Sequence, residues 1–306
     1  MPSPTSKEDI PLPDDKQFAA APSSSPASTL PTSRPQRFPS WRQMDATLDH
    51  TSSLLPLTLL ALLTGLIDGL LYSRTSVWIG FQTGNIVQFS MGVASFIYAP
   101  YHPVPADEGL LTGLRAISFV SFFTASWVGS LAARQGGKGR GRKRWFLIAS
   151  SVVQALLLFG AAGILWSKQE GEEVTYRWFG PVIMLVALSM GLQSILSSGL
   201  SSPIFSTSVA YTATLTQLAS DPHLFTPRLS FLCSSPAKAA EVKGRDLRIL
   251  ALAALALGGG VSQSLLISDA GLRGGLTVAA GLKVLLGALW LIPRGEGEKK
   301  REETRP

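Results

Sequence analysis

Six long apolar runs constrain the fold of this chain more than any other feature. They extend over Leu54 to Tyr72, Leu110 to Ala133, Trp145 to Trp166, Phe179 to Gly199, Leu247 to Ile267 and Gly274 to Ile292. Each is close to the roughly 20 residues that a helix needs to cross the hydrocarbon core of a bilayer. The sequence therefore predicts an all-α integral membrane protein with six transmembrane helices.

The composition agrees with lipid as the solvent. Of the 306 residues, 46% are hydrophobic and 15% are charged, whereas soluble domains carry about 25% charged residues. A net charge of +7 would suggest nucleic acid as the partner of a soluble protein, but here the basic residues lie in short segments between the apolar runs. We interpret them as topology signals and expect the lipid bilayer, not nucleic acid, as the partner.

Two further segments, Val77 to Tyr98 and roughly Pro203 to Ala219, are too polar for ordinary spans and too apolar for simple loops. If both crossed the membrane from a cytoplasmic N-terminus, the loop 134–144, with its six Lys or Arg residues, would lie outside, against the positive-inside tendency. An external N-terminus with eight spans fails on the basic loop 220–246 and on both tails. We therefore predict two broken, re-entrant elements and cytoplasmic N- and C-termini, in a membrane that the sequence does not identify.

The flanks differ in composition from the apolar part. Residues 1–53 are rich in Pro and Ser and are predicted to form a disordered cytoplasmic tail, because they cannot bury enough apolar surface to offset chain entropy. Residues 293–306 form a charged C-terminal tail. The predicted transmembrane domain is the part between them, residues 54–292.

This domain contains a weak internal repeat, with halves at about 54–166 and 179–292. Three pairs of segments match: Gly65–Leu71 with Gly191–Ser197, Thr83–Ser90 with Thr212–Ala219, and Leu114–Ile117 with Leu247–Leu250. The last pair places Arg115 opposite Arg248. Because each half holds three spans, an odd number, the second half is predicted to be inserted upside down relative to the first. Inverted 3+3 repeats are typical of secondary transporters, whose sites lie near the midplane on interrupted helices.

Two motifs carry a resemblance to a known family. Gly65-Leu-Ile-Asp68 is followed by Phe81-Gln-Thr83-Gly84-Asn85, and the pattern returns as Met190-Gly-Leu-Gln-Ser194 and Thr212-Ala-Thr214. Over about residues 54–292 the chain resembles the YoaK-like multi-pass membrane proteins, a domain of unknown function found in bacteria and fungi. The long Pro/Ser tail suits a fungal member. Ser194 and Ala213 depart from the Asn and Gly that the family tends to have there, and the resemblance implies a membrane fold with no established substrate.

The polar residues of the first re-entrant element suggest a site. Non-helical backbone at membrane depth is tolerated only where protein covers it or where it lines a wet cavity. We expect Gly84 to open the helix, Thr83 and Asn85 to cap the exposed end, and Gln82 and Gln88 to bridge to neighbouring helices. The alternative is that these small and amide residues only fasten helices together.

Charges and glycines within the spans add to this expectation. Asp68 and Lys283 lie deep in their runs, and we expect them to face a common interior, either as a coupling or substrate-binding charge or as a fixed ion pair. Arg115 and Arg248 are interpreted as snorkelling residues, with anion binding as the alternative. Gly65, Gly69 and the run 258–260 are interpreted as close-packing positions.

The resulting prediction is a transporter or permease for a small polar or charged solute. Its alternative is a membrane-embedded scaffold or assembly factor without transport activity, and a polar cavity between the two re-entrant elements would favour the transporter. We predict no enzymatic activity, no cofactor and no metal site, and a homo-oligomer stays open. The predicted substrate-binding residues are Asp68, Gln82, Thr83, Gly84, Asn85, Gln88, Gln193, Ser194, Thr212, Thr214, Gln217 and Lys283.

Overall fold

The computed structural model describes residues 41–49, 52–135, 137, 139–167, 176–200, 211–226, 229–230, 236–293 and 295. These residues form helices joined by turns, and no strand occurs among them, apart from isolated bridge residues. The helices are α1 (Trp41–Met44), α2 (Leu54–Thr75), α3 (Gln82–Ile97), α4 (Glu108–Arg134), a short 3-10 turn η1 (Arg140–Arg142), α5 (Arg144–Trp166), α6 (Tyr176–Gly199), α7 (Thr212–Ala219), α8 (Pro236–Ile267) and α9 (Gly271–Leu289).

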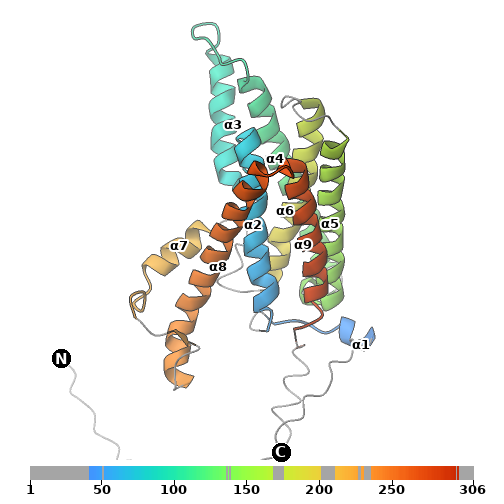
Figure 1. Ribbon diagram of the computed structural model, residues 1–306, viewed down its shortest axis with the longest axis vertical. Coiled ribbons are helices and arrows are strands. Elements are labelled where there is room, and N and C mark those ends of the chain that lie inside the picture. Colours follow the sequence, from blue (N-terminus) through green and yellow to red (C-terminus); the bar gives the residue numbers. More distant parts are fainter. Residues whose placement is uncertain are drawn as a thin grey trace, which may run out of the picture. The chain divides into compact units, whose positions relative to one another are not determined.

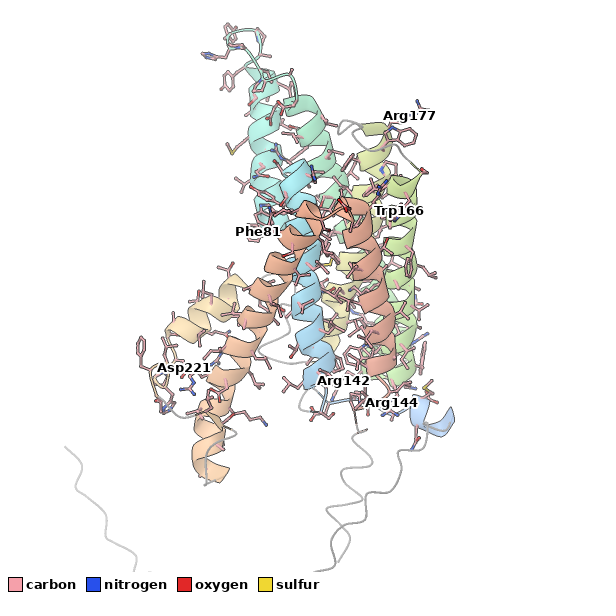
Figure 2. The ribbon with its side chains drawn as sticks, in the orientation of Figure 1. Phe81, Arg142, Arg144, Trp166, Arg177 and Asp221 are labelled. Atoms are coloured by element: carbon pink, nitrogen blue, oxygen red, sulfur yellow. The ribbon has the colours of Figure 1, made fainter. Side chains whose placement is uncertain are left out.

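Six of these helices are long and apolar enough to cross a membrane: α2, α4, α5, α6, α8 and α9. They correspond one by one to the six apolar runs, so the predicted all-helical fold with six candidate spans is confirmed. Trp166 and Arg177 lie at one end of the bundle, and Arg142 and Arg144 lie at the other (Figure 2). The guanidinium carbon of Arg273 lies over the Trp166 ring, 4.4 Å from its centroid. This pairing suits the membrane interface, where aromatic and basic residues are enriched.

Helix packing follows a regular scheme. α2 packs mainly on α8, α4 packs on α6, and α5 packs on both α6 and α9. The short helices α3 and α7 each pack on the long helix that follows them, α4 and α8 (Figure 1). α2 and α6 are the most buried of the six long helices, because each is in contact with several others.

Glycines bring the two tightest helix pairs together. A Cβ placed on Gly65 of α2 would lie 2.0 Å from the backbone oxygen of Leu255 in α8, and one on Gly258 would lie 2.0 Å from the oxygen of Leu62. A Cβ on Gly191 of α6 would lie 2.4 Å from the oxygen of Phe122 in α4. The close-packing interpretation is thus confirmed for Gly65 and Gly258.

The rest of the predicted glycine set divides. A Cβ on Gly69 would lie 2.0 Å from the hydroxyl oxygen of Ser262, so this glycine is also in close contact. Gly259 and Gly260 have open space where a Cβ would be placed. The close-packing interpretation is therefore wrong for these two positions, and the space beside Gly259 belongs to a pocket.

Both flanking segments contact the bundle where the structure describes them. Leu48 forms a bridge with Gly295, and Thr47 forms one with Lys143. The buried guanidinium of Arg144 donates to the carbonyl oxygens of Gln43 and Pro293. The part of the predicted tail at 41–49, the basic loop and the beginning of the C-terminal tail therefore meet at one end of the bundle. Residues 1–40 and 296–306 of the predicted tails lie outside the described residues.

Candidate functional site

The backbone between α2 and α3 leaves helical geometry over residues 76–81. The break begins at Ser76, which has a left-handed φ of 52°. Oδ1 of Asp68 accepts hydrogen bonds from the backbone N–H groups of Ile79 (2.9 Å) and Gly80 (2.6 Å). Asp68 lies seven residues before Thr75, the last residue of α2, which is about 10 Å along the helix axis. The segment 76–81 therefore turns back alongside α2 before α3 begins.

Side chains from α3 and α4 close the remaining peptide groups of this break. Asn85 accepts from the N–H of Trp78 (3.1 Å) and donates to its carbonyl oxygen (2.5 Å). Ser118 of α4 donates to the same oxygen (3.1 Å), and Gln82 donates to the carbonyl oxygen of Ile79 (2.6 Å). An unsatisfied peptide group costs several kcal/mol in hydrocarbon. Gln82 and Asn85 thus fix the broken backbone, as the fastening alternative anticipated.

The expected position of the break is wrong. α3 begins at Gln82 and has no side-chain cap at its N-terminus, so Thr83 and Asn85 do not cap it. Gly84 lies in the first turn of α3, not at an opening. A Cβ on Gly84 would lie 2.7 Å from the Phe81 ring, so this glycine makes room for an aromatic side chain.

A pocket lies between α2 and α8, beside the break before α3 and the start of α7. Its volume is about 440 Å³, which falls in the range of small-molecule sites. We call it the central pocket. It is lined by Thr64, Gly65, Asp68 and Gly69 of α2, Trp78 and Phe81 of the break, Tyr211, Thr212 and Leu215 at the start of α7, and Leu252, Leu255 and Gly259 of α8.

The central pocket contains one carboxylate. Asp68 is partly exposed. Its Oδ1 accepts two hydrogen bonds, and its Oδ2 accepts none within the described part of the chain. Phe81 and Leu215, which also line the pocket, are 38% and 57% exposed, so the pocket reaches the surface. Of the predicted substrate-binding residues, Asp68 and Thr212 line it.

Lys283 belongs to a second polar cluster. Its side chain is fully buried, and its ammonium group donates to Oε1 of Gln154 in α5 (2.5 Å) and to Oε1 of Gln193 in α6. Gln193 in turn donates to the hydroxyl of Thr64 in α2 (2.8 Å). Residues of four helices thus form this cluster, with Thr64 joined to it through Gln193. Asp68 and Lys283 bind different groups, so the alternative of a direct ion pair between them is wrong.

Thr64 links the two polar regions. It lines the central pocket, and its hydroxyl accepts a hydrogen bond from Gln193 of the lysine cluster. Thr64 therefore connects the pocket to the hydrogen bonds around the buried Lys283 ammonium group.

The other predicted site residues lie elsewhere. Thr83 and Gln217 are exposed, and Thr214 is buried. Gln88 is partly buried, and its Oε1 has no hydrogen bond partner in the part of the chain that the structure describes. Ser194 donates to the carbonyl oxygen of Gly191 and lies 3.3 Å from the hydroxyl oxygen of Ser126 in α4. Residues 203–210 of the second predicted element lie outside the described residues.

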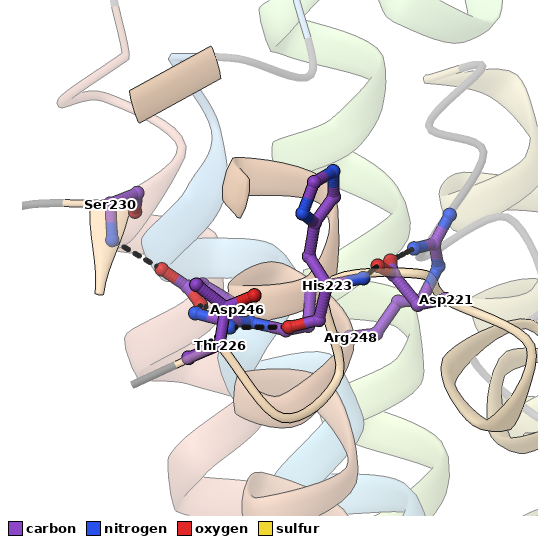
Figure 3. A network of polar contacts seen from close by, with 7 residues as sticks. Asp221, His223, Thr226, Ser230, Asp246 and Arg248 are labelled. Atoms are coloured by element: carbon purple, nitrogen blue, oxygen red, sulfur yellow. Dashed lines mark hydrogen bonds and ion pairs between the residues drawn. The ribbon is translucent and has the colours of Figure 1, made fainter. Parts of the chain in front are cut away.

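Arg115 and Arg248 each pair with a carboxylate, one on the same helix and one on the loop after α7. Arg115 binds Glu108 at 3.1 Å, and Arg248 binds Asp221 at 2.7 Å. The second pair belongs to a wider network, in which Arg245 donates to the carbonyl oxygens of His223 and Thr226 and Asp246 accepts from the N–H of Ser230 (Figure 3). This network fastens the loop after α7 to the first half of α8. Both arginines are thus engaged in ion pairs.

Gln154, Thr64, Trp78 and Tyr211 complete these sites, although sequence reasoning did not select them. Gln154 carried a usable signal, because an amide in the middle of an apolar run needs a partner for the same reason as Lys283. Thr64, Trp78 and Tyr211 carried none, since such residues are common in membrane helices and at their ends. Among the described residues, no three His, Cys, Asp or Glu side chains are grouped closely enough to hold a metal ion.

A comparison with models of known protein families assigns the chain to one of them. A family model described as "Protein of unknown function (DUF1275)" matches residues 57–289. The chain belongs to this DUF1275 family. The match includes all six candidate spans almost completely, together with the break, the central pocket and the lysine cluster. No curated protein and no solved structure matches the chain significantly. Membership of the family therefore assigns no function to the protein.

Proposed function

We propose that this DUF1275 protein is a permease for a small polar or charged solute, and that the central pocket is its binding site. The observation that carries the proposal is the Asp68 carboxylate in a pocket between the two short elements. The feature expected of a transporter was a polar cavity between the two re-entrant elements. The central pocket lies beside these elements and contains a carboxylate, but most of its other lining side chains are aromatic or aliphatic. Interrupted helices at membrane depth are recurrent sites in secondary transporters.

The helix packing supports an inverted-repeat architecture. If α2–α5 correspond to α6–α9 in order, exchanging the halves converts the α2–α8 contact into the α6–α4 contact and the α3–α4 contact into the α7–α8 contact. It also converts the α5–α6 contact into the α9–α2 contact. All of these contacts occur in the structure.

Individual atoms follow the same exchange. The sequence match places Gly65 opposite Gly191, and aligning Leu114 with Leu247 places Phe122 opposite Leu255. Gly65 packs against the backbone oxygen of Leu255, and Gly191 packs against that of Phe122. Two glycines in equivalent positions thus meet two carbonyl groups in equivalent positions, as an approximate two-fold axis requires.

We also propose that both termini are cytoplasmic. The described parts of both tails contact the basic segment around Arg142 and Arg144, and basic loops favour the cytoplasmic side. A YoaK-like relationship and a fungal source stay predictions from the sequence motifs.

The scaffold alternative is favoured by one observation. Gln82, Asn85 and Lys283, which were predicted to bind substrate, are all occupied with protein groups. A protein that used every polar group in this way would be a rigid membrane scaffold. The two functions differ in whether water and solutes reach the pocket.

Cysteine labelling separates the two functions. In a Cys233→Ser background, single cysteines at Thr212 and Leu215 report on the pocket, and a membrane-impermeant thiol reagent is applied to each side of sealed vesicles. Thr214→Cys, on the same helix but buried, is the matched control. Leu285→Cys, on the outer face of α9 and 48% exposed, controls for positions that face lipid.

A permease predicts labelling of Thr212→Cys and Leu215→Cys, and none at Thr214→Cys or Leu285→Cys. Failure of both pocket cysteines to react from either side would mean a dry or lipid-filled pocket, and the scaffold would then be the better account.

A further inference from the structure

The charge in the central pocket indicates which solutes it can take. Lys283 is bound to glutamine oxygens, and Arg115 and Arg248 are bound to Glu108 and Asp221. Within the described part of the chain, no basic side chain forms an ion pair with Asp68. An ionised carboxylate at membrane depth costs about 2.5–3.5 kcal/mol on the mildest scales. A cation in the pocket would relieve this cost, whereas an anion would increase it.

The walls of the pocket favour an organic cation over a metal ion. Ca²⁺ takes six to eight oxygen ligands, and Mg²⁺ retains waters within an octahedral oxygen shell. The pocket offers one carboxylate and few hydroxyl groups, and most of its other lining side chains are aromatic or aliphatic. Such walls suit alkyl groups attached to a charged nitrogen.

Aromatic rings add a specific attraction. Trp78, Phe81 and Tyr211 line the same pocket as Asp68. The Trp78 ring is stacked on the Tyr72 ring, with centroids 4.0 Å apart. The Phe81 ring lies nearly perpendicular to the Trp78 ring, at an interplanar angle of 86°. Their orientation is therefore fixed by packing. Aromatic faces attract ammonium groups, most strongly when the rings belong to Trp and the cation is desolvated.

One pocket-lining residue also has a buried polar group without a partner in the described part of the chain. The Tyr211 side chain is 6% exposed, and its hydroxyl has no hydrogen bond partner among the described residues. Buried tyrosine hydroxyls usually find a partner.

From these observations we infer that the solute is a small organic cation, an alkylated amine or quaternary ammonium compound held between the Asp68 carboxylate and the aromatic rings of the central pocket. This inference rests on the proposed permease function and specifies its substrate class. Gly259, whose Cβ position is open, leaves part of the volume that the alkyl groups occupy.

Binding to the purified full-length chain tests the inference. The probes are choline, tetramethylammonium and trimethylamine, and the matched uncharged control is dimethylbutanol, in which a tert-butyl group replaces the trimethylammonium group of choline. At least one cation is expected to raise the thermal unfolding midpoint, and dimethylbutanol at the same concentration is expected to leave it unchanged. Asp68→Asn is expected to weaken binding of that cation at least tenfold, because it removes the charge partner of the ammonium group.

Three results would overturn the inference: no shift with any of the cations, equal shifts with choline and dimethylbutanol, or undiminished cation binding by Asp68→Asn. Thr212→Cys labelling, measured on the same preparations, distinguishes failure of the substrate class from failure of the permease function. A labelled pocket without cation binding contradicts the substrate class and leaves the permease standing. An unlabelled pocket contradicts the permease itself.

Discussion

The carboxylate of Asp68 accepts a hydrogen bond of 2.6 Å from the backbone N–H of Gly80, twelve residues further along the chain. A charged group in a membrane-spanning helix therefore fixes the backbone that precedes the next helix. The same carboxylate lines the central pocket. A structural role for Oδ1 and a binding role for the carboxylate as a whole can be separated by mutation.

Asp68→Asn keeps an oxygen that can accept from Ile79 and Gly80, whereas Asp68→Ala removes it. Leaving a buried donor unsatisfied costs about 1–3 kcal/mol. We expect Asp68→Ala to lower the free energy of unfolding by about 1–3 kcal/mol more than Asp68→Asn does. Denaturant unfolding in detergent micelles measures the difference, and equal losses for the two variants would contradict the role of Oδ1.

Asn85 and Thr83 provide a matched pair within α3. Asn85 is fully buried and binds both peptide groups of Trp78, whereas Thr83 is exposed. Asn85→Ala should lower the free energy of unfolding by about 1–3 kcal/mol, and Thr83→Ala should stay within about 0.5 kcal/mol of the parent. A Thr83→Ala effect as large as that of Asn85→Ala would argue against a stabilising role for the hydrogen bonds between Asn85 and Trp78.

Gly65→Ala and Gly191→Ala test the equivalence of the two halves. In each case the added methyl group meets a backbone oxygen of the neighbouring helix, and such overpacking costs about 1–3 kcal/mol. Gly163→Ala is the control, because nothing lies within 4 Å of its Cβ position and alanine favours the helix. We expect losses of similar size at Gly65 and Gly191 and none at Gly163, measured as thermal stability. A loss at one of the two glycines alone would weaken the inverted-repeat architecture.

The lysine cluster is tested by a double-mutant cycle of Lys283→Met and Gln154→Leu. Each single change leaves a buried polar partner without its hydrogen bond, so we expect losses of about 1–3 kcal/mol. The double variant should lose less than the sum, with a coupling of about 0.5–3 kcal/mol. Lys283→Met combined with Asn85→Ala is the control, because these residues share no partner and should be additive. Additivity in both cycles would refute the cluster.

The spans were predictable because apolar run length is a local property of the sequence. Gly65 and Gly258 were also predictable, since small residues in apolar helices usually mark close contacts. The partner of Lys283 was not, because Gln154 and Gln193 come from helices whose neighbours are decided only by the packing of α5, α6 and α9. A single charge in a run indicates that a partner exists and not which one.

The position of the first break was not predictable from residue types. Gly84 and its polar neighbours favoured a break within the segment 82–88, but the helix leaves its path at Ser76. The break is stabilised by acceptors and donors from outside it, above all Asp68 and Asn85. Local propensity contains no information about these contacts, whereas it was sufficient to indicate that an interruption occurs near this place.

Gly259 and Gly260 offer the most direct test of the central claim, which is that solutes reach the central pocket. Both lie in α8 with open space at the Cβ position, but only Gly259 lines the pocket within the described part of the chain. Valine at either position has the same cost in helix propensity, and at Gly259 it places its methyl groups in the pocket. The measurement is the rate at which a membrane-impermeant reagent labels Thr212→Cys in a Gly259→Val and in a Gly260→Val background. If solutes reach the central pocket, Gly259→Val slows the labelling several-fold and Gly260→Val leaves its rate unchanged. Equal rates in the two backgrounds, or no labelling in either, would contradict access to the pocket.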